Sequence, residues 1–223
     1  MSGAPAHERI RYSEDRRRLE KAASYNVKYE QEFHKRISDR REKRLLQTIL
    51  AQAGRHERLL DVPCGAGRLS GVLSTCADRV YEVDYSYPML EYCRSNAKSY
   101  VPLLASANVF ALPFRDRAFD MVVSIRVSHH IPAHEDRMKH VRELCRVSSR
   151  HVLLTFFDEN SFKNRIRRAR AQLGSKKRPK KTLTVVDVEA AARESGFEIA
   201  RLWRLFRLFS GHAFTLLHRT ATS

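Results

Sequence analysis

One stretch, Leu59-Leu60-Asp61-Val62-Pro63-Cys64-Gly65-Ala66-Gly67-Arg68, is the most informative part of the chain. It is an apolar strand that ends in an acid and runs into a glycine turn that opens a helix. Gly65 and Gly67 let the backbone approach a ligand closely, and the start of the following helix offers free N–H groups. Asp61, at the strand tip, is suited to bind or orient a cationic amino group. Alone, such a turn is weak evidence for a nucleotide-like ligand.

A second strand, Val80-Tyr81-Glu82-Val83-Asp84, also ends in an acid, and Asp84 lies 17 residues after Gly67. In a β-α-β unit this spacing puts the carboxylate beside the tip of the first strand. There it can accept hydrogen bonds from both hydroxyl groups of a ribose. The two strand ends together are stronger evidence for a nucleoside-containing ligand than either one alone.

A dinucleotide site is an alternative interpretation of the same turn. Gly65-Ala66-Gly67 begins like the G-x-G-x-x-G pattern, but Ser70 stands at the third glycine position and Gly71 comes one residue late. A nicotinamide or flavin site is therefore the weaker hypothesis.

The remainder of the chain alternates between two kinds of segment. Strand-like apolar runs are expected at 58–62, 80–84, 102–107, 119–124, 152–156, 198–205 and 213–218. Helical patterns are expected at 13–53, 67–75, 88–97, 133–146 and 185–195. This alternation predicts an α/β fold with mostly parallel strands and a ligand site at their carboxyl ends. We expect a helical N-terminal extension, 1–54, and one domain, 55–223, with a basic insertion at about 160–182.

Two further motifs connect these features to a known family. They are Asn108-Val109-Phe110-Ala111-Leu112-Pro113-Phe114 and Phe119-Asp120-Met121-Val122-Val123-Ser124. With the first two strand ends, they resemble the Rossmann-like (class I) methyltransferases that depend on S-adenosylmethionine (SAM), in particular the type 11 branch. The resemblance implies an enzyme with a seven-stranded, mostly parallel sheet whose last strand is antiparallel, with helices on both faces.

The resemblance also assigns residues to the cofactor SAM. Asp61, Gly65 and Gly67 would face its methionine part, Asp84 would hold the ribose and Tyr85 would flank the adenine. Asn108 stands where the family usually has Asp, and its side-chain carbonyl can still accept a hydrogen bond from the adenine amino group. Pro63 replaces a glycine often found first in the turn, which changes the shape of the loop. The full expected set is Asp61, Pro63, Cys64, Gly65, Ala66, Gly67, Asp84, Tyr85, Asn108, Val109 and Ser124.

The acceptor side offers two candidate catalytic residues, His129 and His130, which follow the strand at 119–124. Imidazole titrates near neutral pH, so either ring is a candidate base for an O–H or N–H acceptor. The simpler interpretation is that one histidine only packs this loop. Since SAM is an activated donor, proximity and alignment can supply much of the catalysis without a base.

The formal charge of +17 is the one unusual feature of the composition. It favours contact with polyanions such as RNA or an anionic membrane surface. Ten basic residues and no acidic residue lie in 163–181. Within this segment, Phe162, Ile166, Ala169 and Leu173 recur at helical spacing, which predicts a basic amphipathic helix.

This pattern and the type 11 resemblance lead us to expect a small or lipid-linked acceptor at an anionic membrane surface. An RNA acceptor is the second hypothesis, and a non-catalytic interaction module with this fold is the third. The N-terminus has no apolar signal core, so a cytoplasmic location is expected, with peripheral membrane contact as an option. Cys64, Cys76, Cys93 and Cys145 form no C-x-x-C pair, so neither a metal site nor a disulfide framework is expected.

Overall fold

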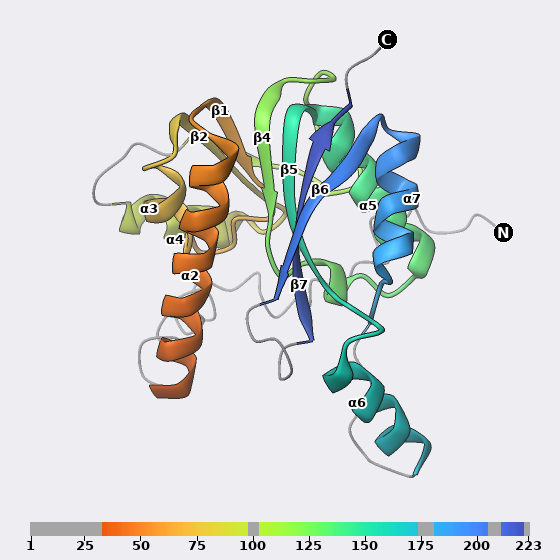
Figure 1. Cartoon of the computed structure of the whole chain (residues 1–223). Helices are drawn as coiled ribbons and strands as arrows, with labels where there is room; N and C mark the ends of the chain where they lie inside the picture. Colours follow the sequence, from red (N-terminus) through yellow and green to blue (C-terminus); the bar gives the residue numbers. More distant parts are fainter. Residues whose placement is uncertain (1–32, 98–102, 174–180, 205–210, 221–223) are drawn as a thin grey trace, which may run out of the picture.

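A computed structural model of the chain describes residues 33–97, 103–173, 181–204 and 211–220 (Figure 1). Its strands are β1 (His56–Asp61), β2 (Ala77–Asp84), β3 (Leu103–Ser106), β4 (Phe119–Ser124), β5 (Ser148–Phe157), β6 (Phe197–Arg204) and β7 (His212–Arg219). Its helices are α2 (Phe33–Ala53), α3 (Ser70–Leu73), α4 (Tyr87–Asn96), the 3₁₀ turn η3 (Ser128–His130), α5 (His134–Val147), α6 (Phe162–Gln172) and α7 (Val185–Glu194).

The seven strands form one sheet in the order β3-β2-β1-β4-β5-β7-β6. β1 pairs in parallel with β2 and β4, and β5 continues the parallel run on β4. β7 is antiparallel to both of its neighbours, β5 and β6. The seven-stranded sheet with an antiparallel last strand is therefore confirmed, and the strand order reverses beside β1, where such sheets bind ligands.

Helices cover both faces of the sheet, as expected. On one face α2 and α3 bury Leu46, Ile49 and Leu73 against β1, β4 and β5. On the other face α5 and α7 bury apolar residues such as Leu144 and Val188 against the same strands. α2 thus shares a core with the sheet, although it precedes the first strand.

The predicted segments differ from the observed ones mainly at their ends. The helix expected at 67–75 shortens to Ser70–Leu73, because turns occupy the residues that precede it. The strand expected at 152–156 begins earlier, at Ser148. The N-terminal helix is seen from Phe33 onward, and the part expected at 13–32 lies outside the described residues.

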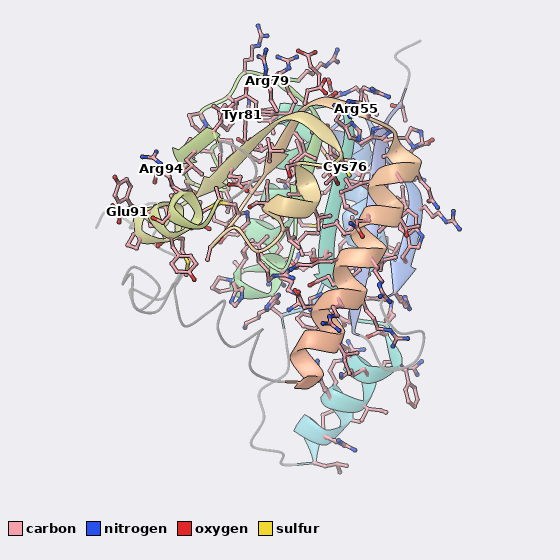
Figure 2. All side chains as sticks on the ribbon, turned by 90° about the vertical axis from the view of Figure 1, so that its left-hand side faces the viewer. Arg55, Cys76, Arg79, Tyr81, Glu91 and Arg94 are labelled. Atoms are coloured by element: carbon pink, nitrogen blue, oxygen red, sulfur yellow. The ribbon has the colours of Figure 1, made fainter. Side chains whose placement is uncertain are left out.

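α2 and α6 both extend beyond the carboxyl edge of the parallel strands (Figure 1). Figure 2 shows the same arrangement from the side, with Arg55 and Arg79 at the opposite, amino edge. α6 continues from the end of β5 and carries five basic residues and no acidic one: Lys163, Arg165, Arg167, Arg168 and Arg170. The basic helix predicted in the insertion is therefore present, while its 174–180 portion lies outside the described residues.

The base of α6 is fixed to the sheet by buried polar contacts. The Asn164 side-chain amide donates to the Asp158 backbone carbonyl at 2.8 Å. The Asp158 carboxylate, only 1% exposed, forms an ion pair with Arg204 of β6. Beyond these contacts Glu159 accepts from Arg168 and from Thr182. The start of the insertion is thus held in a defined place next to the end of β5.

Candidate cofactor and acceptor site

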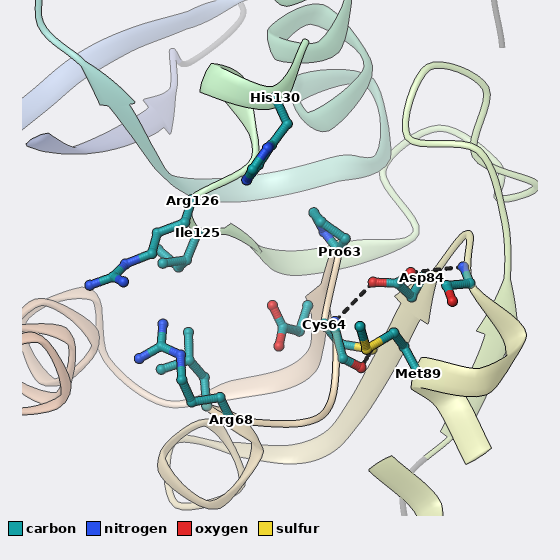
Figure 3. A pocket seen from close by; sticks show the side chains of 12 residues that line it. Pro63, Cys64, Arg68, Asp84, Met89, Ile125, Arg126 and His130 are labelled. Carbon is teal, nitrogen blue, oxygen red and sulfur yellow. Dashed lines mark hydrogen bonds between the residues drawn. The ribbon is translucent and has the colours of Figure 1, made fainter. Parts of the chain in front are cut away.

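A pocket opens at the carboxyl ends of β1, β2 and β4 (Figure 3). It encloses about 650 Å³ of empty space, counting the part open to solvent, a volume in the usual range for small-ligand sites. Six of the residues proposed from the sequence line it: Asp61, Pro63, Cys64, Gly65, Asp84 and His130. Six others were missed: Arg68, Leu69, Ser86, Met89, Ile125 and Arg126.

The glycine turn is joined to the end of β2 through one carboxylate. The N–H of Gly65 donates to Asp84 Oδ2 at 2.9 Å, and the N–H of Ser86 donates to Asp84 Oδ1 at 2.8 Å. Gly65 has a left-handed φ of 57°, and a Cβ built there would meet no atom within 4 Å, so the space above it is open. Each carboxylate oxygen accepts more than one hydrogen bond, so these contacts leave Asp84 able to accept from a ribose.

Three acids gather beneath the turn. Asp61 and Glu82 are cross-strand partners in β1 and β2, and the Glu82 side chain is fully buried. Burial first, and then the neighbouring Glu82 and Asp84, raise the pKa of Asp61 well above its usual range, while Arg68 acts in the opposite direction. The Cys93 thiol donates to Glu82 Oε2 at 2.8 Å. A group with this environment gains most from a nearby positive charge.

Two arginines, Arg68 and Arg126, line the side of the pocket next to α2 (Figure 3). Glu42 of α2, only 1% exposed, pairs with both, at 2.9 Å from each, and Asp39 pairs with Arg68 as well. Arg126 has a φ of 63°, which is uncommon for a residue with a side chain. Its backbone N–H donates to Thr155 Oγ1 at 2.7 Å. The acids that hold these arginines are far away in sequence, so no local pattern reveals the cluster.

The two candidate histidines occupy different places. His130 lines the pocket and enters from the side of η3, across from Arg68 (Figure 3). His129 contacts the ring of Phe157, with ring centroids 4.9 Å apart, and lies 5.9 Å from the ring of His212. His130 is therefore the histidine that faces the cofactor pocket, and His129 packs among other rings.

The other expected cofactor residues do not line this pocket. Tyr85 is 37% exposed, and Ala66 packs against Met89. A Cβ added at Gly67, where φ is 73°, would come within 2.6 Å of Cys93 Sγ. The latter position therefore requires glycine for packing and for its left-handed backbone.

Three expected residues lie around a loop beside the pocket. Asn108 uses its side-chain oxygen to accept from the N–H of Phe110 at 3.0 Å, and Val109 is buried. Behind them, buried His140 has Nε2 3.1 Å from Ser124 Oγ and Nδ1 3.2 Å from the Val109 carbonyl oxygen. Burial lowers the pKa of His140 to about 4, so the ring is neutral and holds the loop to the end of β4.

The sheet order and the pocket at its carboxyl edge define a Rossmann-like α/β protein with a site for a nucleoside-containing cofactor. The family described as "Methyltransferase domain", of the type 11 branch, matches residues 60–156. The match covers β1 to β5 and hence the whole pocket wall described above. The chain therefore belongs to the Rossmann-like, SAM-dependent methyltransferases.

Solved structures share the fold at low sequence identity. The SAM complex of magnesium protoporphyrin IX methyltransferase from Synechocystis PCC 6803 has a TM-score of 0.68 and 17% identity, over 99% of this chain and 100% of that one. A methyltransferase from Haloferax volcanii in complex with its Trm112 activator has a TM-score of 0.59 and 15% identity, over 76% and 85%. At these identities the likeness establishes the fold.

Curated relatives are similar over a shorter part of the chain. "Probable tRNA methyltransferase 9B" from Bos taurus is 34% identical over 89 residues, which are 40% of this chain and 18% of that protein. "tRNA (carboxymethyluridine(34)-5-O)-methyltransferase" from Arabidopsis thaliana is 30% identical over 89 residues, or 40% and 20%. The chain thus spans about a fifth of the length of these relatives.

Proposed function

We propose that this chain transfers the methyl group of SAM to an acceptor carried on RNA. The observation that carries the first half of this proposal is the pocket. Asp61, Gly65 and Asp84 meet there at the carboxyl ends of adjacent parallel strands, within a matched methyltransferase domain.

The residues present fit SAM. In the proposed pose the ribose hydroxyl groups donate to Asp84, and the cationic methionine end lies near Asp61, whose raised pKa reflects a need for positive charge. Arg68 and Arg126 are placed to receive the α-carboxylate. Asn108 and Tyr85 stay proposed partners of the adenine, although they lie outside the pocket lining. SAM supplies a methyl group already activated on sulfur, so the chain mainly has to align it with the acceptor.

The acceptor half of the proposal rests on the relatives and on charge. Both curated relatives carry names that place their activity on tRNA. α6, with five basic residues, and α2 extend past the pocket edge, where they would contact a polyanion. A lipid-linked acceptor gains no support from the relatives. Among the described residues, moreover, no helix is both long and apolar enough to cross a bilayer.

The test is methyl transfer from SAM with a labelled methyl group into a cell lysate. The lysate is then separated into RNA, lipid, protein and small-molecule fractions. We expect the label in RNA, and none with the Asp84→Ala variant. Label confined to lipid would reverse the choice of acceptor. If calorimetry detects no SAM binding and no fraction is labelled, the chain is a non-catalytic module.

A further inference from the structure

A cluster of aromatic and imidazole rings lies next to the cofactor pocket, on the side of β5 and β7. It consists of His129, His130, Phe157 and His212, with Arg167 of α6 above Phe157. We propose that this ring cluster and Arg167 form the acceptor subsite, and that it takes a planar group that carries a negative charge. The inference rests on the proposed function, since it names the acceptor class for the same site.

The cluster is continuous with the cofactor pocket. The His130 ring, which lines the pocket, lies 4.1 Å from the His129 ring. The Phe157 ring is the next neighbour of His129, and Phe157 lies 4.0 Å from the ring of His212. An acceptor in contact with these rings would therefore lie directly beside the place proposed for the methyl group. Flat rings with partly exposed edges suit a flat ligand such as a nucleobase.

Arg167 supplies the charge. Its guanidinium carbon is 5.9 Å from the centre of the Phe157 ring, and one N–H donates to Asn164 Oδ1 at 3.2 Å. A guanidinium has five N–H donors in a planar fork that matches a carboxylate, so this contact leaves donors for a ligand. Because Asn164 is itself bound to the backbone of Asp158, the position of Arg167 is fixed by the anchored base of α6.

The nearby acids do not neutralise this surface. The Asp158 carboxylate is occupied by Arg204, and the Glu159 carboxylate by Arg168 and Thr182. Arg167 makes no ion pair within the part of the chain that the structure describes. The cluster therefore combines three imidazoles with a guanidinium, which favours an anionic ligand and disfavours a cationic one.

An anionic acceptor also simplifies the chemistry. When a carboxylate oxygen attacks, the new C–O bond forms as the S–CH₃ bond breaks. The sulfonium becomes a neutral thioether, the carboxylate becomes a neutral methyl ester, and no proton is released. Such a reaction needs no general base, which agrees with His129 being packed among rings.

The experiment compares two RNA stem-loops that differ in one group. One carries a uracil with a 5-carboxymethyl group, and the other has the neutral carboxamide in its place. Binding of each fluorescein-labelled stem-loop is measured by anisotropy in the presence of the demethylated cofactor product. We expect the parent chain to bind the carboxylate about tenfold more tightly than the amide, the size of one charge-assisted contact.

The matched variants are Arg167→Ala and Arg165→Ala. Both remove one positive charge from α6, but Arg165 is exposed and no contact joins it to the ring cluster in the described structure. Arg165→Ala should weaken both probes equally and keep the tenfold ratio, whereas Arg167→Ala should reduce the ratio to about one. Arg167→Gln, which keeps the contact with Asn164, serves as a second variant if the alanine variant unfolds.

The outcomes separate this inference from the proposed function. If the parent binds SAM and methylates RNA but shows no preference for the carboxylate, the acceptor class is wrong. An unchanged ratio in both Arg167 variants would show that the subsite lies elsewhere. Failure of the parent to bind SAM, or to methylate any RNA, would instead contradict the proposed function itself.

Discussion

The carboxyl edge of the sheet has two ends of opposite electrical character. At β1 and β2 it is acidic, where buried Asp61, Glu82 and Asp84 meet under the glycine turn. At β5 and β7 it is basic, where imidazole rings gather under Arg167. This difference indicates a site for a cationic donor beside a site for an anionic acceptor. Methyl transfer between such partners removes both charges, so neither product is held as strongly as its precursor.

The acidic end depends on a buried, neutral support, and this gives the largest effect that we expect. The pKa of His140 is about 4 in the fold, compared with about 6.5 in an unfolded chain. A lowered histidine pKa means that its stabilisation is complete above pH 6.5 and is lost as the pH falls toward 4. The full loss is about 3 kcal/mol.

Urea unfolding of the parent and of His140→Gln, at several pH values between 7.5 and 4.5, measures this contribution. The difference in unfolding free energy between the two proteins should shrink as the pH falls. Other buried histidines, such as His151, contribute equally to both proteins and cancel. A difference that does not change with pH would show that His140 titrates normally.

The second prediction concerns the shared carboxylate of the acidic end. Asp84→Ala removes both hydrogen bonds to the turn and the proposed ribose contact, so SAM binding should weaken about 30-fold, or about 2 kcal/mol. Calorimetric titration of SAM measures the change. Asp120→Ala, on the amino side of the sheet, is the control and should leave SAM affinity unchanged. Equal affinities for Asp84→Ala and the parent would refute the assignment of Asp84.

The third prediction tests whether α2 belongs functionally to the acidic end. Glu42→Gln leaves Arg68 and Arg126 without their shared buried charge, and we expect the unfolding free energy to fall by about 1 to 2 kcal/mol. Glu135→Gln removes an exposed partner of Arg142 and should cost less than about 0.5 kcal/mol. Thermal unfolding of the two variants provides the comparison. If both are destabilised equally, the Glu42 cluster is no stronger than a surface ion pair.

The smallest effect belongs to the exposed charges of the basic end. The double variant Lys163→Ala and Arg170→Ala should lower the salt dependence of RNA binding, by about 0.7 in slope for each phosphate that the helix no longer neutralises. Its SAM affinity should stay that of the parent. Binding titrations between 50 and 200 mM salt measure both. A fall in SAM affinity with an unchanged salt slope would place α6 on the wrong side of the fold.

Sequence reasoning reached the acidic end because its main residues are neighbours of strand ends. Asp61, Gly65 and Asp84 follow two apolar runs, and a pattern of this kind is visible within about 25 residues. Arg126 was missed because its role depends on Glu42, 84 residues earlier in the chain. The ring cluster was found only in part, since Phe157 and His212 meet through the pairing of β5 with β7. Pairings of this range depend on the tertiary fold and leave no local pattern.

The position of Glu42 also affects where the chain can be shortened. A division after residue 54 separates the first strand from the helix before it, and by sequence that division is natural. In three dimensions it would expose the apolar partners of Leu46 and Ile49 and leave two arginines at the pocket rim without their acid. A fragment that starts at β1 would therefore retain the whole matched segment and still have an altered, more cationic cofactor entrance. For this chain, the limits of similarity to the family are narrower than the limits of the working unit.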